Sequence, residues 1–91
     1  MQSKNKKAMT RGESAHVEQV AALACSVCDV AGQTEVHEPR QGAWWLSMAL
    51  CSDCHRGANN GIHGRKAMWN IKKMDEWDAL GVTIRRIQTG K

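Results

Sequence analysis

The sequence contains no phenylalanine and no tyrosine, and it has a single proline. It also lacks any apolar run of the about 18 residues that a membrane span requires. The apolar stretch of roughly 7–15 residues that marks a secretory signal is missing as well. We therefore expect a cytoplasmic protein with no membrane partner, in which cysteines are metal ligands rather than disulfides.

The chain is short and basic. Its 91 residues suffice for one small domain, and its four tryptophans carry all the aromatic bulk. We therefore expect a small hydrophobic core that needs additional stabilisation, such as a bound metal ion. Lysine and arginine number 13 against 9 aspartate and glutamate, which gives a net charge of +4. This balance favours a polyanionic partner such as nucleic acid, although a solvated basic face accounts for it equally well.

The N-terminal part divides into a tail and a helix. Residues 1–11 are polar and basic without apolar periodicity, which predicts a flexible tail before a single domain over residues 12–91. Thr10 and Glu13 have the spacing of a capping box, and apolar residues then recur every three or four positions. A short helix is therefore expected over about residues 13–24.

Two central segments alternate as strands do. Residues 34–37 form the first and residues 44–50 the second, with Trp44 and Trp45 on opposite faces, so that one of them should be core. The loop between them makes the pair a hairpin. Helical composition returns over residues 65–73, and Asp75 can cap a further turn that Gly81 would end. Residues 82–87 are ambiguous between helix and strand.

The cysteines come in two pairs. Cys25 and Cys28 form one Cys-x-x-Cys pair, and Cys51 and Cys54 form another, with 22 residues between the pairs. Each pair is a knuckle that presents two thiolates to one ion, and the hairpin would bring the knuckles together as a tetrahedral zinc site. Such a site contributes about 10–16 kcal/mol of apparent binding free energy to folding.

Two other cysteine chemistries fit less well. Cys51-Ser-Asp-Cys54-His55 matches the motif for covalent haem attachment. Haem would require export to an oxidising compartment and would leave Cys25 and Cys28 without a role, so no haem is expected. A thioredoxin-like redox pair belongs in a βαβ context that the sequence does not show.

The stretch LCSDCHRGANNGIHG, from Leu50 to Gly64, joins the second knuckle to two histidines, and His37 ends the first predicted strand. Two knuckles, a histidine near the end of a strand and a histidine after the fourth cysteine resemble zinc-stabilised HNH endonucleases. The CHxG…NGIHG portion is the specific part, and it resembles the phage recombination enhancement function (Ref) type of HNH protein over roughly residues 16–85. The resemblance implies an α+β protein with a small ββα-metal core, stapled by the four-cysteine zinc site and flanked by N- and C-terminal helices.

By this resemblance the chain is a metal-dependent endonuclease that hydrolyses phosphodiester bonds in DNA. A catalytic Mg²⁺, Mn²⁺ or Zn²⁺ ion stabilises developing charge while a base deprotonates the attacking water. His55 and His63 would bind this ion, and Asn60, with Asn59 as its rival, would support the base. Four basic residues near the centre would contact the DNA backbone without reading its sequence: Arg40, Arg56, Arg65 and Lys66.

The sequence departs from the family pattern at Val36-His37-Glu38, where relatives have His-His or Asp-His. One alignment puts His37 on the ion and Glu38 in the base position, and the other puts Val36 in the ligand position and keeps His37 as the base. We prefer the first, because the following loop then falls where the family's loop falls. A glutamate is a weaker base near neutral pH than a histidine, so cleavage would be slow or lost.

That departure keeps a second function open. The chain would then be a non-catalytic zinc-ribbon module that binds nucleic acid or protein, with histidines that only form hydrogen bonds. The Ref-type resemblance instead implies a phage-encoded protein that acts in recombination in the cytoplasm of a bacterial host cell. Its partners would be DNA and a RecA-type recombinase or another phage protein. The fourth histidine, His16, is expected at the surface of the first helix.

Overall fold

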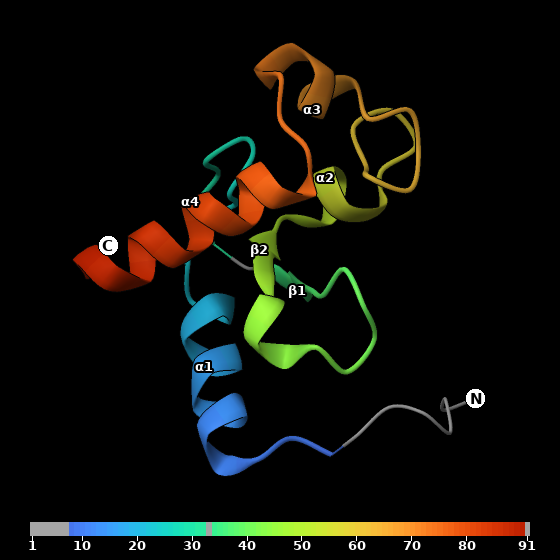
Figure 1. Ribbon diagram of the computed structural model, residues 1–91. Coiled ribbons are helices and arrows are strands. Elements are labelled where there is room, and N and C mark those ends of the chain that lie inside the picture. The colour runs from blue at the N-terminus through green and yellow to red at the C-terminus, as the bar shows by residue number, and fades with distance from the viewer. Residues whose placement is uncertain (1–7, 33, 91) are drawn as a thin grey trace.

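The computed structural model describes residues 8–32 and 34–90. Its elements are α1 (Arg11–Ala21), β1 (Glu35–His37), the 3-10 turn η1 (Trp44–Leu46), β2 (Met48–Leu50), α2 (Ser52–Arg56), α3 (Ala67–Lys72) and α4 (Glu76–Thr89), as Figure 1 shows. Helices and a two-stranded antiparallel sheet agree with the predicted α+β composition. Within the two described ranges, every helix is too short or too polar to cross a membrane.

The sheet lies between two small hydrophobic clusters. The register pairs Glu35 with Leu50, Val36 with Ala49 and His37 with Met48. Met48 and Leu50 pack into the cluster that contains the cysteines, whereas Ala49 packs with Val20 and Leu23 at the end of α1. All three residues of β2 are 0% exposed, because α1 and α4 also contact this strand. A strand covered in this way cannot show apolar and polar alternation.

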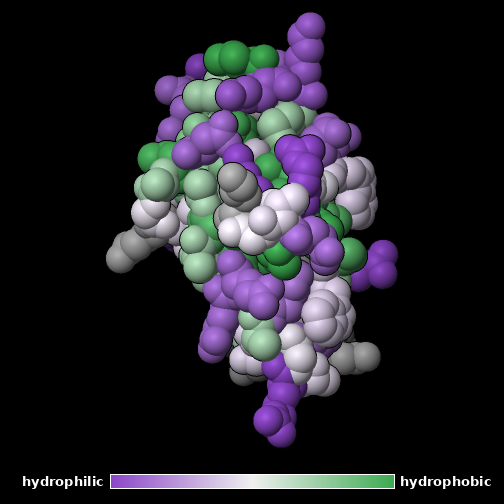
Figure 2. Space-filling model, turned by 90° about the vertical axis from the view of Figure 1, so that its left-hand side faces the viewer, coloured by the Kyte–Doolittle hydropathy of each residue, from purple (hydrophilic) through white to green (hydrophobic). Residues whose placement is uncertain are grey.

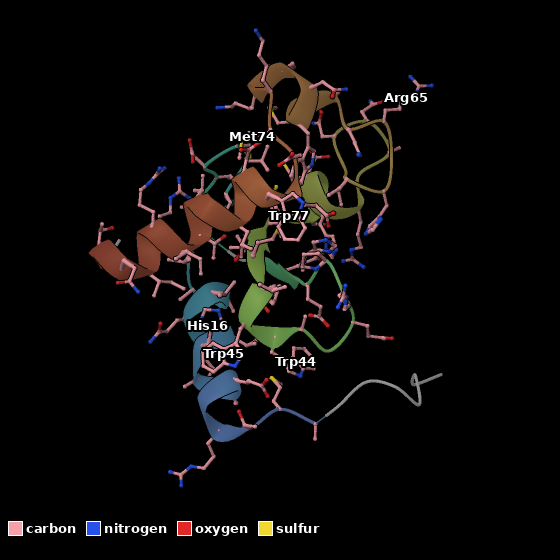
Figure 3. All side chains as sticks on the ribbon, in the orientation of Figure 1. His16, Trp44, Trp45, Arg65, Met74 and Trp77 are labelled. Carbon is pink, nitrogen blue, oxygen red and sulfur yellow. The ribbon has the colours of Figure 1, made fainter. Side chains whose placement is uncertain are left out.

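The second predicted strand is wrong in its first half. Residues Trp44–Leu46 form η1, and the hydroxyl of buried Ser47 closes the turn by donating to the Trp44 carbonyl at 2.6 Å. Trp44 is 9% exposed, which confirms one core tryptophan, whereas Trp45 is 54% exposed. Figure 3 shows the Trp45 ring beside His16 of α1, and their centroids are 5.0 Å apart.

The capping box of α1 is confirmed. The Thr10 hydroxyl accepts from the Glu13 backbone N–H at 3.1 Å, and the Glu13 carboxylate accepts from the Thr10 N–H at 2.8 Å. Thr10 and Arg11 therefore belong to the start of the helix and not to the tail predicted over residues 1–11. The part of that prediction on residues 1–7 lies outside the described residues.

The prediction for α4 is right at its start and wrong at its end. Asp75 caps the helix through a capping box with Asp78, as expected. The helix then runs through Gly81 as far as Thr89, so residues 82–87 are helical, and it ends at Gly90, whose φ of 75° is left-handed. A glycine inside a helix costs only about 1 kcal/mol relative to alanine, and packing overrides that cost here.

The packing that holds α4 is centred on Thr83. This residue is 0% exposed, and its hydroxyl oxygen lies 2.7 Å from the Ser26 hydroxyl and 3.4 Å from the Ala49 backbone nitrogen. These contacts join α4 to the first knuckle and to β2. On the face in Figure 2, hydrophobic side chains are scattered in small groups among hydrophilic ones, so that face carries no single large apolar patch.

Candidate metal centres

The two cysteine pairs meet, as the hairpin predicted. One sulfur from each of Cys25, Cys28, Cys51 and Cys54 lies within 4.8 Å of the others. The Cys28 and Cys51 sulfurs are 3.7 Å apart. Zinc–sulfur bonds of about 2.3 Å in a tetrahedron give sulfur separations of about 3.8 Å. The donor set and its spacing therefore fit one structural zinc ion.

Local backbone geometry builds each knuckle. The Val27 N–H points to the Cys25 sulfur at 3.5 Å, and the Cys54 N–H points to the Cys51 sulfur at 3.4 Å. In both pairs the backbone that follows the first cysteine therefore curls over its sulfur. Such N–H groups stabilise thiolates, which are the form that binds metal.

The ionisation of the thiols is unequal. Burial raises the pKa of Cys54 far above its ordinary value, and the charge of Cys25 adds to this effect. Burial likewise raises the pKa of Cys28. Burial also opposes ionisation of Cys25, but backbone hydrogen bonds from Cys28, Cys51 and Val27 outweigh it and lower the pKa of Cys25. A divalent cation is what would let the remaining thiols ionise beside that thiolate.

Two helices hold the knuckles in place. From α4, Arg86 donates to the carbonyl oxygens of Ala24 at 3.3 Å and Cys25 at 3.2 Å, and it also pairs with Asp29. From α3, the buried Trp69 indole donates to the Cys54 carbonyl at 3.0 Å. The cysteine cluster is thus tied to both C-terminal helices.

Three of the four histidines form a second cluster. One ring nitrogen from each of His37, His55 and His63 lies within 4.8 Å of the others. The ring centroid of His37 lies 5.0 Å from that of His55 and 5.7 Å from that of His63. These residues come from the end of β1, from α2 and from the loop after α2. The structure therefore brings together the three residues that the family resemblance places on one ion.

The loop that carries His63 is packed against itself. A Cβ atom on Gly61 would lie 2.4 Å from the Gly57 carbonyl oxygen, and one on Gly64 would lie 2.5 Å from the Ala58 carbonyl oxygen. Real Cβ atoms do not approach backbone so closely, which explains both glycines. Both glycines are therefore required by the packing of the loop itself.

Asn60 helps to tie this loop to α2. Its side-chain amide donates to the Asp53 carboxylate at 2.8 Å, and the neighbouring Ile62 N–H donates to the Cys54 carbonyl at 2.9 Å. Asn60 therefore supports the segment that presents His63. Asn59, its sequence rival, contributes its backbone carbonyl, which accepts from the Ala67 N–H at 2.7 Å.

Two carboxylates that sequence reasoning missed contact the histidine cluster. Glu76 Oε2 lies 2.7 Å from His37 Nε2, and Glu35 Oε1 lies 2.7 Å from His55 Nδ1. The hydrogen bonds of His55 and then Arg56 lower the pKa of Glu35. Glu35 comes two positions before His37 on the same strand, a spacing that puts both on one face. No local pattern connects Glu76 to His37.

An open pocket adjoins the histidines. Its volume is about 390 Å³, and it is lined by Val36, His37, Glu38, Pro39, Gln41 and His63. Glu38 thus shares one hollow with His37 and His63, and its carboxylate also lies 3.5 Å from the Gly42 backbone nitrogen. This arrangement suits an acid or base next to an ion.

The basic residues predicted to contact DNA are not equivalent. Arg40, Arg65 and Lys66 are exposed, and Figure 3 shows the Arg65 side chain extending from its loop away from the body of the molecule. The Arg56 side chain is 66% exposed but pairs with Glu35. Arg56 therefore has a structural contact in addition to any ligand it binds.

No protein-family model, no curated protein and no solved structure matches this chain. The resemblance to HNH proteins accordingly rests on the motif residues. The functional argument rests on the geometry of the two clusters.

Proposed function

We propose that this protein is an HNH-type metal-dependent endonuclease that hydrolyses phosphodiester bonds in DNA on a ββα-metal core. One observation carries the proposal. His37, His55 and His63 come from β1, α2 and the loop that follows, and their ring nitrogens lie within 4.8 Å of one another. Cys54 of the cysteine cluster lies on the same short helix, α2, so an ion bound by the cysteines would hold this helix in place. A phage protein in the cytoplasm of a bacterial host would meet DNA substrates there.

The residues of the histidine cluster fit a divalent ion. Three neutral imidazoles suit zinc and similar transition ions, while Mn²⁺ and Mg²⁺ prefer oxygen and would take water or phosphate oxygens as well. An ion bound there supplies Lewis-acid stabilisation of the charge that develops on the phosphate and the leaving oxygen. The exposed edge at His63 leaves access for a substrate oxygen.

The chain's own residues supply the remaining roles. Glu38 lies in the pocket beside the histidines, where its carboxylate can take a proton from a water that attacks phosphorus. The bond from phosphorus to the leaving oxygen then breaks. The pocket volume of about 390 Å³ leaves room for a phosphodiester group and this water. Arg40, Arg65 and Lys66 can neutralise neighbouring phosphates, which gives affinity with little sequence preference.

A cleavage assay with a matched histidine control tests this function. The zinc-loaded protein is incubated with supercoiled plasmid and with single-stranded DNA in the presence of Mg²⁺ or Mn²⁺. His63→Ala removes a histidine of the cluster, whereas His16→Ala makes the same change at a histidine that lies beside Trp45. We expect cutting by the wild type and by His16→Ala, and none by His63→Ala.

Two results would overturn the proposal. Cutting by His63→Ala at the wild-type rate would show that the activity does not come from this centre. Absence of cutting by the wild type on either substrate, with a DNA mobility shift in all three proteins, would favour the non-catalytic zinc-ribbon module.

A further inference from the structure

The histidine cluster is supported by carboxylates that bind different ring atoms. Glu76 contacts Nε2 of His37, and Glu35 contacts Nδ1 of His55, each at 2.7 Å. A neutral imidazole carries one N–H and one lone pair, so the nitrogen that donates to a carboxylate cannot bind a metal. The lone pair is therefore left on Nδ1 of His37 and on Nε2 of His55.

Carboxylates in such positions are characteristic of metal-binding histidines. They select the tautomer, hold the plane of the ring and make the ligating nitrogen more basic. His37 is 8% exposed and the Glu76 side chain is 35% exposed, so the imidazole end of this hydrogen bond is shielded from water.

Glu76 lies in a well-formed first turn of α4, and the helix is fixed to other elements further along. Asp75 caps the first turn through its hydrogen bond with the Asp78 backbone at 2.9 Å. Further along the helix, Thr83 contacts β2 and Arg86 contacts the first knuckle. Glu76 thus projects from a helix that is fixed to both β2 and the first knuckle.

We propose that Glu76, from the C-terminal helix, is a positioning residue that orients His37 for a divalent ion at the histidine cluster. The inference rests on the proposed function in so far as that ion is the catalytic one. It adds that α4 is part of the active centre and not only a flanking helix. Glu35 acts in the same way on His55, and Arg56 in turn holds Glu35.

The test measures metal affinity separately from DNA cleavage. Ni²⁺, which imidazole binds well, is titrated by calorimetry into the full-length zinc-loaded protein, and elemental analysis verifies that one zinc per chain is retained. We expect Glu76→Ala to weaken Ni²⁺ binding about 10- to 100-fold, as loss of such a partner typically does. Glu76→Gln should lose less, because its amide oxygen still accepts a hydrogen bond from His37.

The matched control is Asp78→Asn, which removes one negative charge from the same turn of α4. Asp78 contacts the Asp75 backbone, and this variant should bind Ni²⁺ as the wild type does. Wild-type affinity in Glu76→Ala, equal losses in the Ala and Gln variants, or no Ni²⁺ binding by the wild type would each overturn the inference. A weaker Ni²⁺ site in Glu76→Ala together with no DNA cleavage by the wild type would uphold it and reject the nuclease.

A spectroscopic measurement checks the tautomer directly. Long-range ¹H–¹⁵N spectra of the imidazole rings report which nitrogen carries the proton. In the wild type we expect the proton of His37 on Nε2, and in Glu76→Ala a mixture of tautomers. A wild-type His37 protonated mainly on Nδ1 would contradict the proposed orientation.

Discussion

The four-cysteine cluster and the three-histidine cluster meet at α2, yet they are built differently. Cys25 and Cys54 are 0% and 1% exposed, and backbone N–H groups close over the sulfurs of the knuckles. The histidines instead range from the buried His37 to the exposed His63, and these two border an open pocket. A closed set of four ligands is typical of a structural ion, and an open set of three is typical of a catalytic one. One short helix thus carries Cys54 of a cluster suited to a structural ion and His55 of a cluster suited to an ion with open positions.

The largest expected effect separates the two clusters by their contribution to folding. Cys51→Ala removes one of the four clustered thiols. A structural zinc ion bound there would supply about 10–16 kcal/mol, as much as the whole stability of a typical domain. We expect the variant to be unfolded at 25 °C, as measured by circular dichroism and zinc content. His63→Ala, at an exposed position, should change the free energy of unfolding by less than about 0.5 kcal/mol. A cooperative melt of Cys51→Ala with zinc bound would contradict the comparison.

The second effect compares a buried tryptophan with an exposed one. Trp69 is 1% exposed in the cluster around the cysteines, whereas Trp77 is 62% exposed next to Glu76. Trp69→Ala should lower the free energy of unfolding by about 3–5 kcal/mol, and Trp77→Ala by less than about 0.5 kcal/mol. Urea denaturation measures both. Equal losses would show that Trp77 contributes to the stability of the fold despite its exposure.

The third effect falls on the loop of the histidine cluster. Gly61→Ala would put a methyl group 2.4 Å from the Gly57 carbonyl oxygen, so the loop that carries His63 must move. We expect a loss of about 1–3 kcal/mol of stability, typical of overpacking, together with weaker Ni²⁺ binding. The zinc content should stay at one per chain. Unchanged Ni²⁺ affinity would show that His63 does not depend on the close packing of its loop.

The residues of both clusters were predictable for different reasons. Each Cys-x-x-Cys pair is a local unit, so spacing alone predicts a knuckle, and the hairpin predicts that the two knuckles meet. The histidines are scattered, and only the resemblance of the LCSDCHRGANNGIHG stretch grouped His55 and His63 with His37. Nothing in the sequence indicated the contact between Glu76 and His37, because these residues are 39 positions apart and meet only through the packing of α4.

The wrong predictions of secondary structure come from contacts that a pattern of apolar residues does not record. An apolar residue at every second position from Trp44 to Leu50 predicted a strand, but the Ser47 hydroxyl stabilises a turn at the Trp44 carbonyl instead. Short-range hydrogen bonds of this kind compete with a sheet ladder and leave no trace in a pattern of apolar residues. Likewise, the contacts of Thr83 with Ser26 and Ala49 extend α4 beyond the glycine where local propensity would end it.

Gly81 gives the smallest expected effect, and it can be compared directly with Gly61. Gly81 lies inside α4, and a Cβ atom there would meet no atom within 4 Å. Alanine restricts the unfolded chain and favours the helix, so Gly81→Ala should raise the free energy of unfolding by about 0.5–1 kcal/mol. Thermal melts of the zinc-loaded protein measure this, and Ni²⁺ affinity should stay unchanged. A glycine-to-alanine substitution would thus stabilise α4 at position 81 and disrupt the loop of His63 at position 61. Gly81 has room for a methyl group, whereas at Gly61 the backbone of Gly57 leaves none. A loss of stability in Gly81→Ala would mean that α4 bends or opens at this position.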